Sequence, residues 1–404
     1  MKKEKLGGLL IIVMAALLMT FGSCGDGAGG GGTGKVWLDR ADGSSTQYDN
    51  LFMTMLNITL DQMMGKGSTY TIRIYEDQNP PYLNVPLSNI SITIKAPGSP
   101  ITINCDGDDD SALLFQLEDS SSMTIDSGIT IKGITWNAAF EVGGFHSGAE
   151  TGATLVLNEG VFITGFQNAI IVNFEDSLVT LNGAIIKDFT EIGVSLDEGA
   201  KLIMNKGEIS GKAAINVHFW GVFLDHNAEF IMNGGTISGS NTGDTCGVIV
   251  NSSAAFTMNG GKITGNKYEI GAGVMNEGTF IMTGGEISGN AAERAGGGVY
   301  SSGHDASITM TGGTITGNSA KLGGGVYNAN FEESVFKKTG GTITGIDDVN
   351  GNRASEAGHA VISDHNARGG ANPAFNVRNS TADPGIPMDS LIDYPDGGWD
   401  GTIE

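Results

Sequence analysis

Gly284-Gly285-Glu286-Ile287-Ser288-Gly289-Asn290 is the stretch that decides the fold, because close copies of it recur along the chain. Four more copies keep the Gly-Gly-x-Ile-Ser/Thr-Gly core and begin at Gly234, Gly260, Gly312 and Gly340. Looser copies lie near Lys206, Ala184, Gly160 and Gly128. Successive second glycines are 23 to 32 residues apart, about 27 on average. A period of this length with variable spacing indicates a solenoid whose coils share a fixed core and differ in their loops.

Each repeat carries the two-residue alternation of a β-strand. Phe280-Ile281-Met282-Thr283 precedes one glycine pair, and its side chains are expected to point alternately inward and outward. The glycine pair permits a sharp bend, and a second short strand follows with its Ile facing inward. Gly297-Gly298-Val299-Tyr300 is typical of a third strand. The sequence therefore predicts an all-β, single-stranded, right-handed parallel β-helix with three short strands per coil and a short N-terminal helical cap.

Other repeat architectures of similar period fit less well. A leucine-rich consensus is missing, and 64 glycines among 404 residues disfavour the helices of ankyrin or tetratricopeptide repeats. The Gly-Gly-x-Gly-x-Asp motif of a calcium-binding β-roll is missing as well. The Gly-rich strings are not followed by a helix, so a phosphate-binding loop is disfavoured.

Stacking the repeats predicts continuous columns of buried side chains. One column contains Leu202, Phe230, Phe256, Phe280 and Ile308. The column beside it contains Met204, Met232, Met258, Met282 and Met310. Lys338 falls where the methionine column should continue. This position predicts either a frayed last coil or a slip of one residue in its register.

The chain begins with the features of an export signal. A basic start, Met1 to Lys5, precedes the apolar run from Leu6 to Phe21, which is short for a membrane span. The small residues before Cys24 resemble the lipobox of bacterial lipoproteins. This resemblance implies cleavage after residue 23 and acylation of Cys24, with anchorage to the outer membrane. A plain signal peptide with an unrelated cysteine is the alternative.

The remaining chain divides into four parts. Residues 24–34 form a Gly-rich tether after the lipidated cysteine. Residues 35–110 form the N-terminal cap and first coils, with a helix expected from Asn50 to Met64. Residues 111–364 contain the β-helix repeats, and residues 365–404 form an irregular tail or cap in which the repeat is lost.

Charge and cysteine content exclude some functions. The net charge is −23, from 22 basic and 45 acidic residues, which disfavours nucleic-acid binding. Cys105 and Cys246 lie several coils apart in the predicted solenoid, too far for a disulfide, and are expected to be buried. No Cys/His spacing suggests a zinc site.

The repeats resemble a known superfamily. Coils of Gly-Gly-x-Ile-Ser/Thr-Gly-Asn with Gly-Gly-Gly-Val-Tyr, as at Gly296 to Tyr300, look like those of the pectin-lyase-like right-handed β-helices. They are most similar to bacterial surface lipoproteins and to the Gly-Gly-Ala-Ile repeats of polymorphic outer-membrane proteins. The resemblance covers residues from about 70 to 364. It implies the fold more strongly than any activity, because one fold carries many functions.

Two clusters are candidate sites. Asp106, Asp108 and Asp110 offer oxygen ligands for calcium, although an acidic turn is the simpler interpretation, so we predict neither a metal nor a cofactor. His218 and Trp220 lie near Asp225 and His226 in sequence, and Trp136 lies in an earlier, less regular coil. These residues either fill the core and its loops or present aromatic and polar groups to a sugar. The outward column of Glu208, Thr236, Lys262, Glu286, Thr314 and Thr342 indicates a solvated face.

The sequence favours a non-catalytic, lipid-anchored surface protein. Its coils would present a long, loop-decorated face for adhesion to carbohydrate, or to a host or neighbouring surface protein. The alternative is a β-helix that binds or degrades a polysaccharide with the loops of its first half. An enzyme would require His, Arg or Lys converging with carboxylates in one groove.

Overall fold

The computed structural model describes most of the chain after its N-terminal segment. The described residues are 36–80, 86–105, 113–133, 137–144, 151–211, 218–239, 244–330, 335–364, 375–389, 396 and 398–403. Contacts divide the chain into residues 1–33 and 34–404, and the fold below belongs to the second unit. Within the described ranges, no helix has the length and apolar character needed to span a bilayer.

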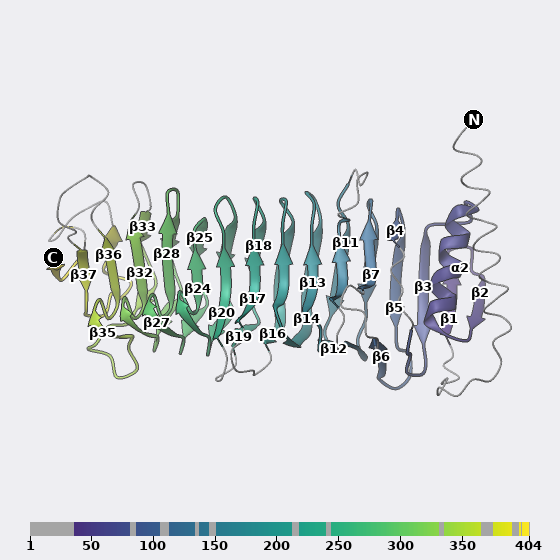
Figure 1. Cartoon of the computed structure of the whole chain (residues 1–404), viewed down its shortest axis with the longest axis horizontal. Helices are drawn as coiled ribbons and strands as arrows, with labels where there is room; N and C mark the ends of the chain where they lie inside the picture. Colours follow the sequence, from purple (N-terminus) through teal and green to yellow (C-terminus); the bar gives the residue numbers. More distant parts are fainter. Residues whose placement is uncertain are drawn as a thin grey trace. The chain divides into compact units, whose positions relative to one another are not determined.

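The second unit is a right-handed parallel β-helix, which confirms the predicted fold class. The largest β-sheet, sheet A, contains two parallel ladders of strands. The strands before each glycine pair form its first ladder. Figure 1 shows strands of successive coils lying side by side in chain order. The first ladder contains β3 (Thr69–Ile74), β5 (Ser91–Lys95), β8 (Ser122–Ile125), β11 (Thr154–Asn158), β14 (Leu178–Phe189), β16 (Lys201–Gly211), β18 (Glu229–Met232), β21 (Ala255–Met258), β25 (Thr279–Met282), β29 (Ser307–Met310) and β33 (Val335–Lys338).

The strands after each glycine pair form the second ladder of the same sheet. Strands β14 and β16 continue through the bend and take part in both ladders. The second ladder also contains β6 (Ile101–Cys105), β9 (Ile129–Gly133), β12 (Val161–Thr164), β19 (Thr236–Ser238), β22 (Lys262–Thr264), β26 (Glu286–Ser288), β30 (Thr314–Thr316) and β34 (Thr342–Ile343).

Sheet B supplies the third strand of every coil. Its parallel strands are β4 (Pro86–Ser88), β7 (Leu113–Glu118), β10 (Ala138–Val142), β13 (Asn168–Val172), β15 (Ile192–Leu196), β17 (His218–Leu224), β20 (Asp244–Val250), β24 (Val274–Asn276), β28 (Val299–Gly303), β32 (Val326–Asn330) and β36 (Val361–Asp364). Sheet C adds a fourth strand to the later coils, beyond the predicted three. It contains β23 (Lys267–Ile270), β27 (Ala291–Ala295), β31 (Ser319–Leu322) and β35 (Arg353–Ala357).

The predicted core columns are present in register. Phe230, Phe256 and Phe280 are paired across neighbouring strands, and their rings stack with centroids 4.8 and 5.1 Å apart. The second glycine of each pair explains the adjacent methionine column. Gly285 has φ +82°, and a Cβ there would lie 2.6 Å from the Cε of Met258 in the preceding coil. The glycine therefore serves both the backbone bend and the packing of methionine.

A ladder of buried asparagines ties the later coils together. Asn266 donates from Nδ2 to Oδ1 of Asn290 at 2.9 Å, and Asn290 donates to Asn318 at the same distance. Asn318 donates in turn to Asn352 at 2.9 Å. Each acceptor oxygen also receives the backbone N–H of the preceding asparagine, so the buried amides are well satisfied. The closing member, Asn352, lies beyond the last Gly-Gly-x-Ile-x-Gly copy and was not recognised in the sequence.

The N-terminal end is closed by the predicted cap. Helix α2 (Leu51–Met63) agrees with the expected helix, and the Asn50 side chain caps it by accepting the N–H of Met53. Strand β1 (Val36–Arg40) pairs antiparallel with β2 (Ser45–Tyr48) and with β3. This cap covers the first parallel strand, which would otherwise be an open edge.

The C-terminal end corrects both expectations for Lys338. Phe336 and Lys338 pair with Ile308 and Met310, so the coil neither frays nor slips. Lys338 is fully buried, and its Nζ donates to the carbonyls of Asp383 and Ile386 at 2.7 and 2.8 Å. The residues after the repeats therefore satisfy an amine that replaces the methionine. They also add three antiparallel strands, β37 (Phe375–Arg378), β38 (Met388–Asp389) and β39 (Gly401–Ile403).

Two early coils differ from the predicted alignment by one residue. Val161 pairs with Ile129, and the next register places Val161 opposite Ala184. The position equivalent to the second glycine of later coils is therefore held by Ile129 and Val161 instead of Gly128 and Gly160. Both glycines have positive φ, so the bend in these coils comes one residue earlier than in the later ones.

Candidate functional site: a polar groove over three stacked turns

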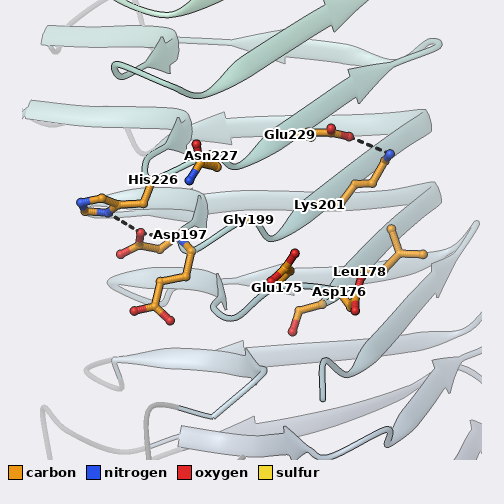
Figure 2. Close-up of a pocket in the computed structure, with 11 residues that line it drawn as sticks. Glu175, Asp176, Leu178, Asp197, Gly199, Lys201, His226, Asn227 and Glu229 are labelled. Carbon is orange, nitrogen blue, oxygen red and sulfur yellow. Dashed lines mark hydrogen bonds and ion pairs between the residues drawn. The ribbon is translucent and has the colours of Figure 1, made fainter. Parts of the chain in front are cut away.

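A groove of about 910 Å³ lies over three stacked turns in the first half of the β-helix. The turns join β13 to β14, β15 to β16 and β17 to β18, where the chain passes from sheet B to sheet A. Its lining is polar and includes Lys201, His226 and Asn227 (Figure 2). It also includes five carboxylates, those of Glu175, Asp176, Asp197, Glu198 and Glu229.

Local hydrogen bonds fix the shape of the turns. Oδ1 of Asp197 accepts the N–H of Glu198 at 2.7 Å, and Oδ1 of Asp225 accepts the N–H of His226 at 3.0 Å. Both residues that follow these aspartates have positive φ, 52° for Glu198 and 36° for His226. The aspartates thus stabilise a tight turn that carries a long side chain outward. The N–H of Gly199 donates to the carbonyl of His226, which joins the two turns.

The imidazole of His226 lies between two carboxylates. Its Nδ1 is 2.6 Å from Oδ1 of Asp197, on the neighbouring coil, and 3.6 Å from Oδ2 of Asp225. The hydrogen bond to Asp197 and the negative charges of Asp225 and Asp197 raise the pKa of His226 above its ordinary value. The two carboxylates therefore stabilise the imidazolium relative to the neutral ring, although the ring remains largely exposed.

A second ion pair lies on the sheet A side of the groove. Nζ of Lys201 is 2.8 Å from Oε2 of Glu229, and the two residues are cross-strand neighbours on β16 and β18. Figure 2 shows the His226–Asp197 and Lys201–Glu229 pairs on opposite sides of the groove, with Gly199 between them. The carboxylates of Glu175 and Asp176 come from the turn of the preceding coil.

The structure brings together only part of the predicted site. Asp225 and His226 belong to the groove or its rim, as the sequence suggested. Trp220 lies on the outer side of β17, half-buried and stacked on Phe223 with ring centroids 5.1 Å apart. Phe219 is buried in the core, which confirms that some aromatic residues of this half fill the interior.

Other predicted residues are not placed in the groove. The backbone of His218 pairs with that of Asp244 at the start of β17. Cys24, Trp136 and the three calcium candidates, Asp106, Asp108 and Asp110, lie outside the described residues. Among the residues that are described, no group of three or more His, Cys, Asp or Glu side chains is arranged to hold a metal ion.

Asp197, Glu198 and Lys201 were missed because they lie one repeat before His226, and Glu229 was missed because its partner Lys201 lies in that earlier repeat. A signal for them exists in the sequence. Asp197 precedes Met204 by the same seven residues that separate Asp225 from Met232. Aligning the repeats on the methionine column would have placed these two turns on neighbouring coils.

Sheet B also has an apolar outer column. Tyr300 and Tyr327 are in register and stack with centroids 5.4 Å apart and planes inclined by 5°. The same column contains Ile171, Ser195, Phe223, Ile249, Met275, Tyr300, Tyr327 and Ile362. Most of these side chains are half-buried, so the column forms a regular apolar stripe on an otherwise acidic protein.

The fold and this site define the class of the protein as a parallel β-helix with a polar groove over its turns. No protein-family model, curated protein or solved structure matches the chain.

Proposed function

We propose that the chain is a non-catalytic surface protein that binds a neutral polysaccharide in the groove over the three turns. The observation that carries this proposal is the groove itself, with its fixed carboxylates, one amide, one lysine and one histidine. Carboxylate and amide groups held by turns are suited to hydrogen bonding with the many hydroxyls of a sugar. The ordered turns would lose little conformational entropy when a ligand binds.

The charge of the groove favours an uncharged ligand. Five carboxylates line it against one lysine ammonium and one histidine, and the whole chain carries a net charge of −23. Nucleic acids and polyuronates would be repelled by this surface. The proposed fold therefore resembles that of pectin-lyase-like proteins, but the proposed ligand is not an acidic polysaccharide.

Binding is favoured over cleavage by the contacts of His226 and Lys201. Nδ1 of His226 is held by Oδ1 of Asp197 at 2.6 Å, so this nitrogen is engaged within the turn. The ammonium of Lys201 is likewise engaged with Glu229. Both side chains thus act as positioning and hydrogen-bonding elements.

The proposed cellular location is inferred from the N-terminal sequence. An acylated Cys24 and a Gly-rich tether, residues 24–34, would hold the β-helix close to the bacterial outer membrane. Adhesion to a glycan on a host or neighbouring cell surface is the role consistent with this location. Globomycin treatment, which blocks lipoprotein signal cleavage, would cause a precursor to accumulate, and Cys24→Ser would release the protein from the membrane fraction.

The binding proposal is tested by calorimetry of residues 35–404 with laminarin, mannan, soluble xylan and polygalacturonate. We expect binding to one neutral glycan, no binding to polygalacturonate, and at least a tenfold loss of affinity in Asp197→Ala/His226→Ala. Lys262→Ala, on the solvated face of sheet A, is the matched control and should bind normally. Equal binding by the double variant, or preference for the polyuronate, would refute the proposal.

A second candidate is a retaining glycoside hydrolase. Asp197 and Asp225 occupy equivalent positions on adjacent coils and approach the same Nδ1 at 2.6 and 3.6 Å. Adjacent coils are separated by about 4.8 Å, close to the roughly 5 Å carboxylate separation of retaining enzymes. Release of reducing ends by the wild type, lost in both Asp197→Asn and Asp225→Asn, would replace the binding proposal with this one.

A further inference from the structure

Trp220 and Phe223 form an aromatic pair on β17, the strand that leads into the third turn of the groove. They lie three residues apart on β17, and their rings are inclined by only 20° with centroids 5.1 Å apart. Both side chains are half-buried, although most large aromatic residues near them are enclosed in the core. The neighbour of Phe223 on the preceding coil is Ser195, which has a much smaller side chain.

The backbone of β17 connects the pair to the turn that carries Asp225 and His226. Phe223 and Asp225 are two residues apart, so the strand period places them on the same outer side. Asp225 in turn lies 3.6 Å from the imidazole of His226. Five residues separate Trp220 from Asp225, a span of about 16 Å along an extended chain.

We propose that the groove and the Trp220–Phe223 pair are two parts of one binding site for an extended neutral glycan. This inference rests on the proposed function and adds the length of the ligand. The polar groove would bind the hydroxyls of the first sugar units, and the aromatic pair would contact the apolar C–H face of a later unit. A span of about 16 Å requires an oligosaccharide of several units.

The chemistry of the two parts predicts different dependences on ligand length. A disaccharide engages only the groove, so its affinity depends on Asp197 and His226 and not on the aromatic pair. A longer chain adds the aromatic contact, which typically increases affinity about three- to tenfold. Further units beyond the pair contribute little.

The experiment measures affinity by calorimetry for an oligosaccharide series, from disaccharide to hexasaccharide, of the glycan bound by the wild type. Laminari- and manno-oligosaccharides are the first probes. We expect the gain with length to disappear in Trp220→Ala and Phe223→Ala, while the disaccharide binds as before. Tyr300→Ala, in the same outer column but three coils away, is the matched control and should keep the gain.

A fluorescence measurement keeps the test valid if Trp220→Ala folds poorly. Trp220→Phe retains an aromatic ring and should retain the length dependence, while losing the change in tryptophan emission caused by the longer ligand. An emission change that persists in Trp220→Phe would overturn the inference. So would a gain with length that is unaffected by both alanine variants. Failure of the wild type to bind any member of the series would instead refute the proposed function.

Discussion

At the residue scale, single residues satisfy the geometric constraints that stacking the repeats imposes. Because Gly285 has no Cβ, it can adopt a positive φ and also leaves room for the side chain of Met258. His226 fixes two neighbouring turns through one carboxylate on each. These residues have different roles, since the glycine recurs in the later coils and the histidine occurs in one.

The environment of His226 predicts a distinct titration. Because the folded pKa is raised, the stabilisation from this contact is fully present below the ordinary histidine pKa of about 6.5. It is lost as pH rises through the raised folded value. Asp197→Asn should move the His226 titration downward in an NMR experiment, and Asp305→Asn, beside His304, is the control that should leave it unchanged. An unaltered titration in Asp197→Asn would contradict the assignment of the cause.

The Gly285–Met258 contact predicts a coupled effect on stability. Gly285→Ala should lower the free energy of unfolding by about 2 kcal/mol or more, through backbone strain and a clash with Met258 Cε and with backbone atoms of Gly260 and Gly261. Gly289→Ala is the matched control, because its φ is also positive but its Cβ would meet only Thr264 Oγ1 at 3.5 Å. In urea unfolding, Gly285→Ala/Met258→Ala should show a smaller loss than the sum of the single variants. Additive losses would show that the clash is unimportant.

At the scale of the element, two asparagine ladders run along the same β-helix in different environments. The inner ladder of Asn266, Asn290, Asn318 and Asn352 is buried. The outer ladder links asparagines before the glycine pairs, for example Asn259 to Asn233 at 3.0 Å, in contact with solvent. The geometry is similar, but water can replace the outer bonds and cannot reach the inner ones.

This difference in solvent access predicts a difference in stability. Asn318→Ala should lower the free energy of unfolding by about 3 kcal/mol, because it removes the buried amide that donates to Asn352 and Ile287 and accepts from Asn290. Asn259→Ala, the matched control on the outer ladder, should cost less than about 1 kcal/mol. Urea unfolding of both variants measures the difference. Equal losses would show that burial does not decide the strength of the ladder.

At the scale of the whole molecule, a solenoid must close both ends of its core. The N-terminal end uses α2 and an antiparallel strand, and the C-terminal end uses β37, β38 and the carbonyls that accept from Lys338. Burial lowers the pKa of Lys338, with a partly opposing effect of the nearby Asp383. The buried lysine therefore binds the C-terminal segment to the last coil through its two hydrogen bonds.

Lys338→Met tests this docking. The methionine would extend the apolar column but leave the carbonyls of Asp383 and Ile386 without a donor, at a cost of about 1–3 kcal/mol each. We expect faster hydrogen exchange and proteolysis in residues 375–403, with the earlier coils unchanged. Lys337→Met, on the exposed side of the same strand, is the control. Unaltered protection of the C-terminal segment would refute the role assigned to Lys338.

The predictability of the structure follows the regularity of the repeat. Glycine pairs, alternating strands and the Phe and Met columns are encoded within each unit, so the fold and core could be predicted. Asp225 and His226 were recognised because they are adjacent in the sequence. Asp197 was not, because its proximity to His226 depends on the alignment of two coils. In the same way, Asn352 follows an insertion that hides its equivalence to Asn318.

The sequence by itself determined the coil, its period, its inward columns and the N-terminal helix, because these depend on alternation and glycine positions within a few residues. The tertiary structure decided which turns share a groove, which aromatic residues face outward and how Lys338 is accommodated. These features depend on which residues become neighbours when coils of unequal length are stacked. The loops that set those lengths leave the strand register intact, so they change the surface without changing the fold.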